Sequence, residues 1–273
     1  MDRRLTPATA RVAHDSLRGV VDAPAFTPGS ARHLARPLTD LLTRPAGARE
    51  RQLLLGDRFV VVDRDAGHAF GFASKDGYCG WLPEAALADD SPPPTHWVAA
   101  PASHLYPEPR VQAPEIAALP MGARLCVVHL HTTWAETRTG FVPACHLRAL
   151  GDWAADPAGV AESLLGTPYL WGGNSRAGID CSGLVQLALH ACGRPCPGDS
   201  DLQQVLGTAL PPDAAHTRGD LMFWRGHVAM VTDARTLIHA NGHSMSVAHE
   251  PIRATIARIA AQHGGMVTHR RRP

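Results

Sequence analysis

The first half of this 273-residue chain contains one pattern twice, and such a repeat restricts the folds that are open to it. Each copy has short apolar runs rich in β-branched residues and bounded by Gly, Asp and Pro, which is typical of short β-strands. Each copy also ends on Gly-aromatic-aliphatic-Pro, with a Leu four residues further on. The matches, in the same order, are 35–45 with 99–109, 56–62 with 122–128, and 80–83 with 140–143. We therefore expect two small β-barrels in tandem.

The rest of the chain follows other patterns. Apolar residues at near-helical spacing between Thr9 and Val21 predict a helical N-terminal arm. After residue 150 we expect a helix over 154–165, a Gly-rich loop, a second helix and then strands, which makes this part α+β. The residues Ser91-Pro92-Pro93-Pro94 suit a stiff linker between the barrels. The predicted domains are 1–31 (arm), 32–90 and 91–150 (barrels), and 151–273 (α+β domain).

Charge argues against two classes of partner. The chain has 26 basic and 25 acidic residues, and its basic run, Arg270 to Arg272, is a short terminal segment that we expect to be disordered. We therefore predict no nucleic-acid partner and no membrane partner. No apolar stretch is long enough to span a bilayer, and no apolar signal segment follows Met1, so we expect a cytoplasmic protein.

Cys181 is the candidate nucleophile. Gly and Pro residues before it predict an irregular loop, and apolar residues after it at helical spacing predict a helix. Cys181 would then lie in the first turn, where unpaired amides and the helix dipole stabilise a thiolate and lower its pKa. The same amides can bind a developing oxyanion. The alternative is a buried structural cysteine, the usual fate of a free thiol.

Two histidines twelve residues apart are candidates for its base and for the residue that orients the base. We expect a strand to open with His227 and a return strand to carry His239. A three-residue loop at 233–235 would place His239 opposite Ala229 and on the same face as His227. His227 could then take the thiol proton while His239 orients its ring.

Zinc sites are the metal alternatives. Cys192 and Cys196 are separated by three residues but have no second pair to complete a site. His227, His239 and His243 lack the spacing of a zinc motif. We predict no cofactor.

Five motifs together resemble the NlpC/P60 family of cysteine peptidases. They are Pro-Tyr-Leu-Trp-Gly-Gly at 168–173, Asp-Cys-Ser-Gly-Leu-Val at 180–185, Gly-Asp-Leu at 219–221, Gly-His-Val at 226–228 and Ile-His-Ala at 238–240. The resemblance implies a papain-like catalytic domain that hydrolyses peptidoglycan stem peptides. It also implies Cys181 as nucleophile, His227 as base and His239 as third member. The Gly-aromatic-aliphatic-Pro endings in turn resemble those of bacterial SH3 domains.

Two SH3-like domains before such a core resemble γ-D-glutamyl-L-diamino acid endopeptidases, which cleave peptides with a free N-terminal L-Ala. The resemblance implies that Asp199 and Ser200 bind the L-Ala end and that Tyr78 covers the pocket. An arginine often precedes the Asp-Ser pair in relatives, whereas Gly198 stands here. Asp199 or Ser200 could also cap a helix, and Tyr78 could be a barrel aromatic.

The resemblance implies further residues near the pocket, namely Tyr169, Trp171, Asp180 and Ser182. Tyr169 could donate to the oxyanion, Asp180 and Ser182 could hold polar groups of the substrate, and Trp171 could equally be structural. The expected function is cleavage of the γ-D-Glu–diamino acid (meso-diaminopimelate) bond during cell-wall recycling. The alternatives are a papain-like amidase or acyltransferase, and a non-catalytic protein that binds wall peptides.

Overall fold

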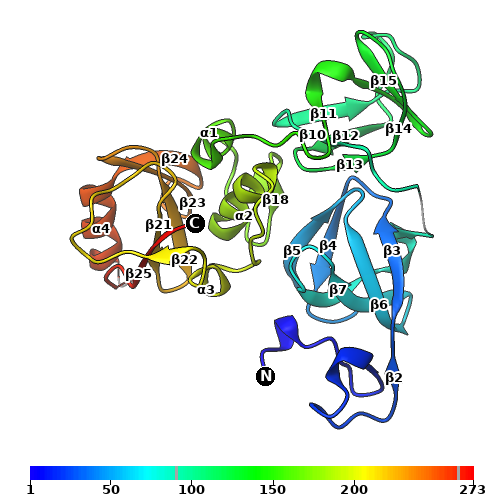
Figure 1. Cartoon of the computed structure of the whole chain (residues 1–273), viewed down its shortest axis with the longest axis horizontal. Coiled ribbons are helices and arrows are strands. Elements are labelled where there is room, and N and C mark those ends of the chain that lie inside the picture. The colour runs from blue at the N-terminus through cyan, green and yellow to red at the C-terminus, as the bar shows by residue number, and fades with distance from the viewer. Residues whose placement is uncertain (90–91, 263–264) are drawn as a thin grey trace. The chain divides into compact units, whose positions relative to one another are not determined.

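A computed structural model describes residues 1–89, 92–262 and 265–273. The chain divides into two compact units, Met1–Asp152 and Trp153–Pro273. It is mostly β, with few helices (Figure 1). The predicted boundary at 90/91 and the linker residue Ser91 lie outside the described residues. No helix in the described ranges combines the length and the apolarity that a bilayer crossing demands.

The predicted repeat recurs as a repeated strand pairing in the first unit. In the first copy β3 pairs with β6 and β9, and in the second copy β10 pairs with β13 and β17. In both copies a three-residue 3-10 helix connects the Gly-aromatic-aliphatic-Pro strand to the last strand. The first copy contains β3 (Ser30–Leu34), β4 (Leu38–Leu42), β5 (Arg49–Leu54), β6 (Arg58–Asp65), β7 (His68–Ala73), β8 (Cys79–Pro83), the 3-10 helix Glu84–Ala86 and β9 (Leu87–Ala88). The second contains β10 (His96–Val98), β11 (Ala102–Leu105), β12 (Ala117–Pro120), β13 (Arg124–Leu125), β14 (Val127–Leu130), β15 (Trp134–Thr137), β16 (Gly140–Pro143), the 3-10 helix Ala144–His146 and β17 (Leu147–Ala149).

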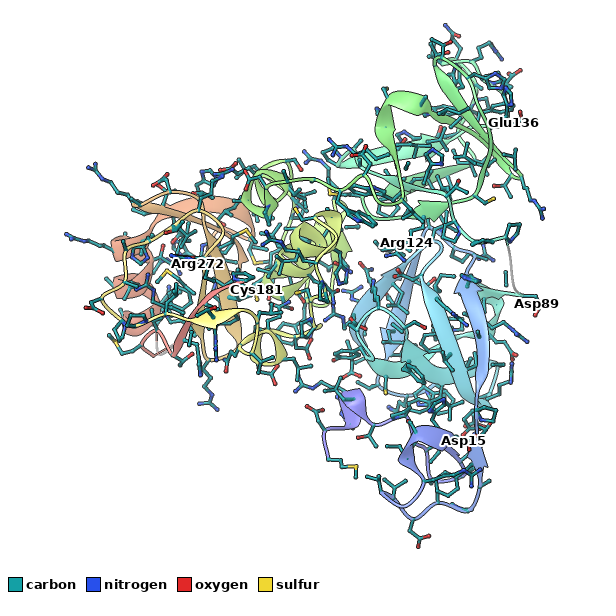
Figure 2. The ribbon with its side chains drawn as sticks, in the orientation of Figure 1. Asp15, Asp89, Arg124, Glu136, Cys181 and Arg272 are labelled. Carbon is teal, nitrogen blue, oxygen red and sulfur yellow. The ribbon has the colours of Figure 1, made fainter. Side chains whose placement is uncertain are left out.

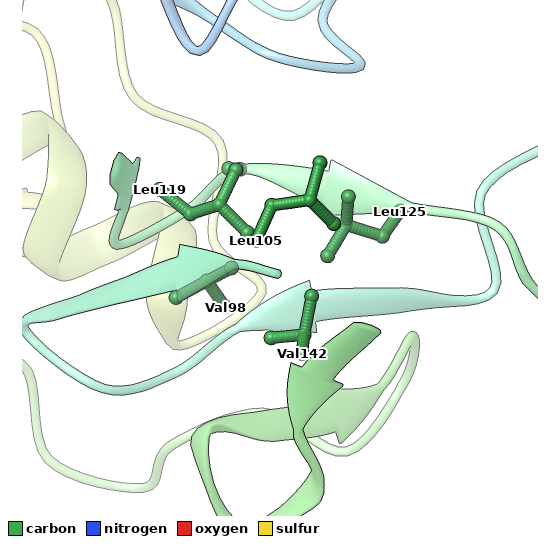
Figure 3. Close-up of a cluster of buried hydrophobic side chains, with 6 residues drawn as sticks. Val98, Leu105, Leu119, Leu125 and Val142 are labelled. Atoms are coloured by element: carbon green, nitrogen blue, oxygen red, sulfur yellow. The ribbon is translucent and has the colours of Figure 1, made fainter. Parts of the chain in front are cut away.

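Each copy has its own apolar core. In the first copy Val62, Phe70 and Cys79 are buried together. In the second, aliphatic side chains from several strands meet (Figure 3); they are Val98, Leu105, Leu119, Ala123, Leu125 and Val142. Leu55 of the first copy also packs against this second cluster, so the two copies are in contact.

The prediction of a helical N-terminal arm was wrong. The segment forms two 3-10 turns, Arg3–Leu5 and Asp15–Leu17, and a short parallel pair of β1 (Ala13–His14) with β2 (Phe26–Thr27). Gly19 interrupts the helical pattern with a positive φ, and the side chains of Thr9 and Arg11 bond to Asp63 of the first β copy instead. Arg11 pairs with Asp63 at 3.0 Å, which ties the segment to β6.

The second unit is a six-stranded antiparallel sheet with helices on both sides. The strand order is β20-β25-β21-β22-β23-β24. Figure 1 shows α2 and α4 on opposite sides of this sheet. The elements are α1 (Pro157–Glu162), β18 (Asn174–Ser175), β19 (Gly178–Ile179), α2 (Cys181–Ala191), α3 (Ser200–Gln203), β20 (Thr208–Ala209), β21 (Leu221–Trp224), β22 (His227–Val231), β23 (Thr236–Asn241), β24 (Ser246–Pro251), α4 (Ile252–Ala261) and β25 (His269–Arg272).

The C-terminal tail is a strand and not a disordered segment, so that prediction was also wrong. β25 lies between β20 and β21 and pairs with both. Arg272 bonds through Nε and Nη2 to the buried carboxylate of Asp220, at 2.7 and 2.9 Å. Tertiary contacts of this kind cannot be deduced from a short basic run.

Candidate active site

Asp180 begins the helix that carries the cysteine. Its Oδ1 accepts hydrogen bonds from the Gly183 amide at 2.7 Å and from the Ser182 hydroxyl at 2.9 Å. Its Oδ2 accepts from the Gly172 amide at 2.8 Å. Asp180 is therefore the N-cap of α2 and also holds the preceding loop against the helix. Both oxygens of Asp180 thus accept hydrogen bonds from groups of the protein itself, and the Ser182 hydroxyl donates to Asp180.

Cys181 is the first residue of α2, as predicted, and lies at the start of that helix in the second unit (Figure 2). Its side chain is buried, and burial together with the Asp180 carboxylate raises the pKa of its thiol to about 12. The backbone amides of Val228, Ser182 and Cys181 act in the opposite direction and lower this pKa. The predicted lowering of this pKa was wrong in its net sign, because loss of hydration outweighs the amides.

His227 and His239 form the predicted pair. The hairpin register, Met230 opposite Ile238, continues to place His239 opposite Ala229. His227 Nε2 lies 2.8 Å from His239 Nδ1. His227 opens β22, and the next amide, that of Val228, bonds the Cys181 sulfur. The end of β22 therefore adjoins the start of α2.

Both rings are neutral at neutral pH. Burial, followed by the neighbouring His239, lowers the pKa of His227 to about 3. Burial is also the main cause that lowers the pKa of His239 to about 4. The Trp224 ring, 5.8 Å from the His227 ring between centroids, forms part of the cover that excludes water. The Cys181 thiol and the His227 imidazole are therefore both neutral in the free protein.

Tyr169 and Trp171 lie in the loop before α2. Tyr169 is half-buried, and burial, followed by Cys181 and Asp180, raises the pKa of its phenol to about 12. The phenol therefore stays protonated and able to donate. Trp171 is 69% exposed, which excludes a core role for its ring. Gly173 allows the tight loop, because a Cβ there would lie 2.5 Å from the Gly178 carbonyl oxygen.

Asp199 occupies the N-cap position of α3, but its side chain does not cap that helix. Ser200 is buried in the first turn. A residue that the sequence reasoning missed, Gln203, holds this segment in place. Its Nε2 lies 3.0 Å from the carbonyl oxygen of Ser182 and 3.2 Å from that of Gly198. Its position in a polar stretch of sequence gave no signal of this burial.

Tyr78 lies in the first unit, on the loop before β8. It is buried, and the Arg51 guanidinium stands over its ring at 5.1 Å. These contacts favour the alternative that Tyr78 is a structural aromatic residue of the barrel. Its place over the substrate stays a prediction.

The zinc alternatives gain no support from the geometry. Across residues 1–89, 92–262 and 265–273, no three His, Cys, Asp or Glu side chains converge as metal ligands. The contact between His227 and His239 is the part of the predicted site that the geometry shows, and the catalytic roles of Cys181, His227 and His239 stay predictions.

Comparisons with known proteins agree with this arrangement. The NlpC/P60 family profile matches residues 166–263, and that of the bacterial dipeptidyl-peptidase SH3 domain matches residues 41–87. A γ-D-glutamyl-L-lysine dipeptidyl-peptidase of Bacillus cereus is 27% identical, over 91% of this chain and 85% of its own. One of Bacillus subtilis is 28% identical, over 64% of each chain.

A solved structure shows the same fold. The crystal structure of an NlpC/P60 family protein from Bacillus cereus has a TM-score of 0.76, covers 89% of this chain and 99% of its own, and is 22% identical. The chain therefore carries an NlpC/P60 domain together with a bacterial SH3 domain. Proteins with this domain are peptidoglycan hydrolases, typically cysteine peptidases. A second SH3 domain and a papain-like core stay predictions.

Proposed function

We propose that this chain is a cysteine endopeptidase that cleaves the γ-D-Glu–diamino acid bond of peptidoglycan stem peptides with a free N-terminal L-Ala. The observation that carries the proposal is the Cys181 sulfur at the start of α2, against the amide that follows His227, with His239 bonded to His227. The related Bacillus proteins act, by name, on γ-D-glutamyl-L-lysine. We expect meso-diaminopimelate here, and action on recycled wall fragments in the cytoplasm.

The reaction starts with proton transfer from the Cys181 thiol to the His227 imidazole. The sulfur forms a bond to the γ-carbonyl carbon of D-Glu, and the carbonyl oxygen becomes an oxyanion that helix amides and the Tyr169 phenol stabilise. The carbon–nitrogen bond then breaks as His227 returns the proton to the leaving amine. A thioester remains. Water attacks it with His227 as base, and the thiol is regenerated.

Substrate selection rests on the charge of the L-Ala end. A free peptide carries an α-ammonium group there, and the Asp199 carboxylate is the group proposed to pair with it. A peptide still linked to glycan has an amide at this place and lacks the charge. Tyr78, Trp171, Asp180, Ser182 and Ser200 complete the proposed binding residues.

The test is digestion of free L-Ala-D-Glu tripeptides beside their glycan-linked forms, with the products identified by mass. Both meso-diaminopimelate and L-lysine tripeptides are used. We expect loss of the diamino acid from the free form, and cleavage of the linked form that is slower by about 100-fold, about 2.7 kcal/mol. Release of N-acetylmuramic acid instead would identify an amidase.

Asp199→Asn is the specificity variant, and Asp201→Asn, two residues further in α3, is its matched control. We expect Asp199→Asn to slow cleavage of the free peptide and to remove most of the discrimination. The control is expected to keep it. Equal cleavage of both peptide forms by the unaltered protein would overturn the proposed role of Asp199.

A further inference from the structure

Three polar side chains form a row across neighbouring strands of the catalytic sheet. His239 in β23 is opposite Ala248 in β24, and Glu250 is two residues beyond Ala248. Residues two apart on a strand share a face, so Glu250 lies on the face of His239, which is also the face of His227. Side chains of α4 pack on this face, where Ile252 and Ile256 join Trp224 and Leu237 in one apolar cluster.

The Glu250 carboxylate is held from α4 through one of its two oxygens. Arg258 Nη2 donates to Oε2 at 2.7 Å, and the Thr255 hydroxyl donates to the same oxygen at 2.9 Å. The other oxygen, Oε1, lies 3.7 Å from His239 Nε2. Helix α4 thus aims a fixed anion at the far side of the His239 ring.

His239 Nε2 needs such a partner. It is buried, and no group among the described residues is within hydrogen-bond distance of it. For His227 to receive a proton from Cys181, its Nε2 must already carry hydrogen and donate it to His239 Nδ1. His239 then carries its own hydrogen on Nε2, facing Glu250. If the distance between His239 Nε2 and Glu250 Oε1 became shorter by about 0.7 Å, the two atoms would form an ordinary hydrogen bond.

The charges around the two rings divide by sign. Glu250 raises the pKa of His227 and of His239, whereas Arg258 lowers both. His239 also lowers the pKa of His227, and His243 lowers the pKa of His239. Glu250 is therefore the anion that favours a positive charge on the pair.

We propose that Glu250 is a positioning residue of the site, which accepts the Nε2 hydrogen of His239, sets the tautomer of the His227–His239 pair and stabilises the imidazolium that forms when Cys181 loses its proton. The proposal rests on the proposed role of His227 as base. It extends the site from three residues to four and makes α4 part of it.

The test uses alkylation of Cys181 by iodoacetamide, followed by peptide mass mapping, which needs no peptide substrate. We expect Glu250→Gln to lower the alkylation rate at neutral pH about 10-fold, as loss of one pKa unit on the imidazole would. In ¹⁵N spectra of the unaltered protein we expect the hydrogen of the His239 ring to be on Nε2. In Glu250→Gln we expect this signal to be lost or to be shared with Nδ1. In turnover, kcat should fall with little change in KM.

Two further variants separate charge from folding. Glu250→Asp keeps the charge but draws it back by about 1.5 Å, and is expected to retain part of the rate. Arg253→Gln, at an exposed arginine of the same helix, is the control and should react as the unaltered protein does. The proposal would be overturned if folded Glu250→Gln showed an unchanged alkylation rate and an unchanged His239 tautomer. If that variant does not fold, the same two unchanged readouts in Glu250→Asp would overturn it. If the protein cleaved no peptide, the proposed function would be contradicted, but the alkylation rate and the His239 tautomer would still test the role of Glu250.

Discussion

Burial decides the protonation of the residues that would do the chemistry. The pKa of the Cys181 thiol is raised to about 12 and that of His227 is lowered to about 3, so each group is neutral in the free protein. The ion pair needed for attack has to form when the substrate is bound. Amides at the start of α2 and the anion of Glu250 stabilise its two charges, one at each end.

The first prediction concerns the nucleophile and the base. Cys181→Ala and His227→Ala are each expected to reduce kcat by about 1,000-fold or more, because each removes one partner of the proton transfer. Thermal unfolding should change little. Cys145→Ala, at an exposed cysteine, is the control and should retain full activity. Substantial turnover by either site variant would contradict the mechanism.

The second prediction concerns pH and stability. The pKa values of His227 and His239, about 3 and about 4, lie below the ordinary value of 6.5, so the unfolded chain binds these protons more readily. This contribution to the free energy of unfolding is fully present above pH 6.5 and is lost as pH falls toward 4. Urea denaturation at a series of pH values measures it.

His239→Asn tests the assignment, since an amide does not titrate. The slope of stability against pH should fall by up to about one proton in this variant. His104→Asn, at an exposed histidine of β11, is the control and should keep the original slope. A slope that stays the same in His239→Asn would refute the assignment.

At the scale of elements, α2 is held at its start by the loop before it and by α3. Gln203 in α3 reaches the carbonyl oxygens of Ser182 and Gly198, and so connects the Asp199 segment to the residue after the nucleophile. The segment that contains Asp199 and helix α2 therefore share one buried side chain.

The third prediction follows from this contact. Gln203→Ala removes the side-chain donor to the buried Ser182 and Gly198 carbonyl groups and should lower the free energy of unfolding by about 1–3 kcal/mol. KM for the free tripeptide should rise more than kcat falls, because the Asp199 segment loses its support. Gln204→Ala, at the half-buried neighbour, is the control in both measurements. Equal behaviour of the two variants would rule out the supporting role.

At the scale of the whole molecule, the chain end is part of the catalytic unit. β25 lies between β20 and β21, and Arg272 closes the sheet against Asp220, whose side chain is 1% exposed. Burial and the Arg272 contact act in opposite directions on the Asp220 carboxyl, and the net pKa is lowered. The last residues therefore stabilise a sheet whose other strands carry the site.

The fourth prediction is that Arg272→Ala lowers the free energy of unfolding of the second unit, because it leaves a buried carboxylate without its cation. The expected loss is smaller than for a fully buried pair, since Arg272 is itself 47% exposed. Arg253→Ala, at an exposed arginine of α4, should change stability little. Chemical denaturation of both variants compares them, and similar curves would argue against the ion pair.

Local pattern was enough to predict the elements that carry Cys181, His227 and His239. A Gly-rich break before a helical pattern, and an even spacing across a short turn, depend only on backbone geometry near those residues. For the same reason the duplicated strands of the first unit could be recognised. These features are determined by residues close together in the chain.

Burial and distant partners were decided by the tertiary structure alone. The N-terminal segment has a helical pattern but bonds to β6 instead, and the basic tail becomes a strand because Asp220 lies beside it. The sign of the Cys181 pKa shift depended on how much water the fold removes, which no local pattern contains. Glu250 and Gln203 likewise act through partners brought together by the sheet and helices, since packing, not sequence distance, sets which polar groups meet.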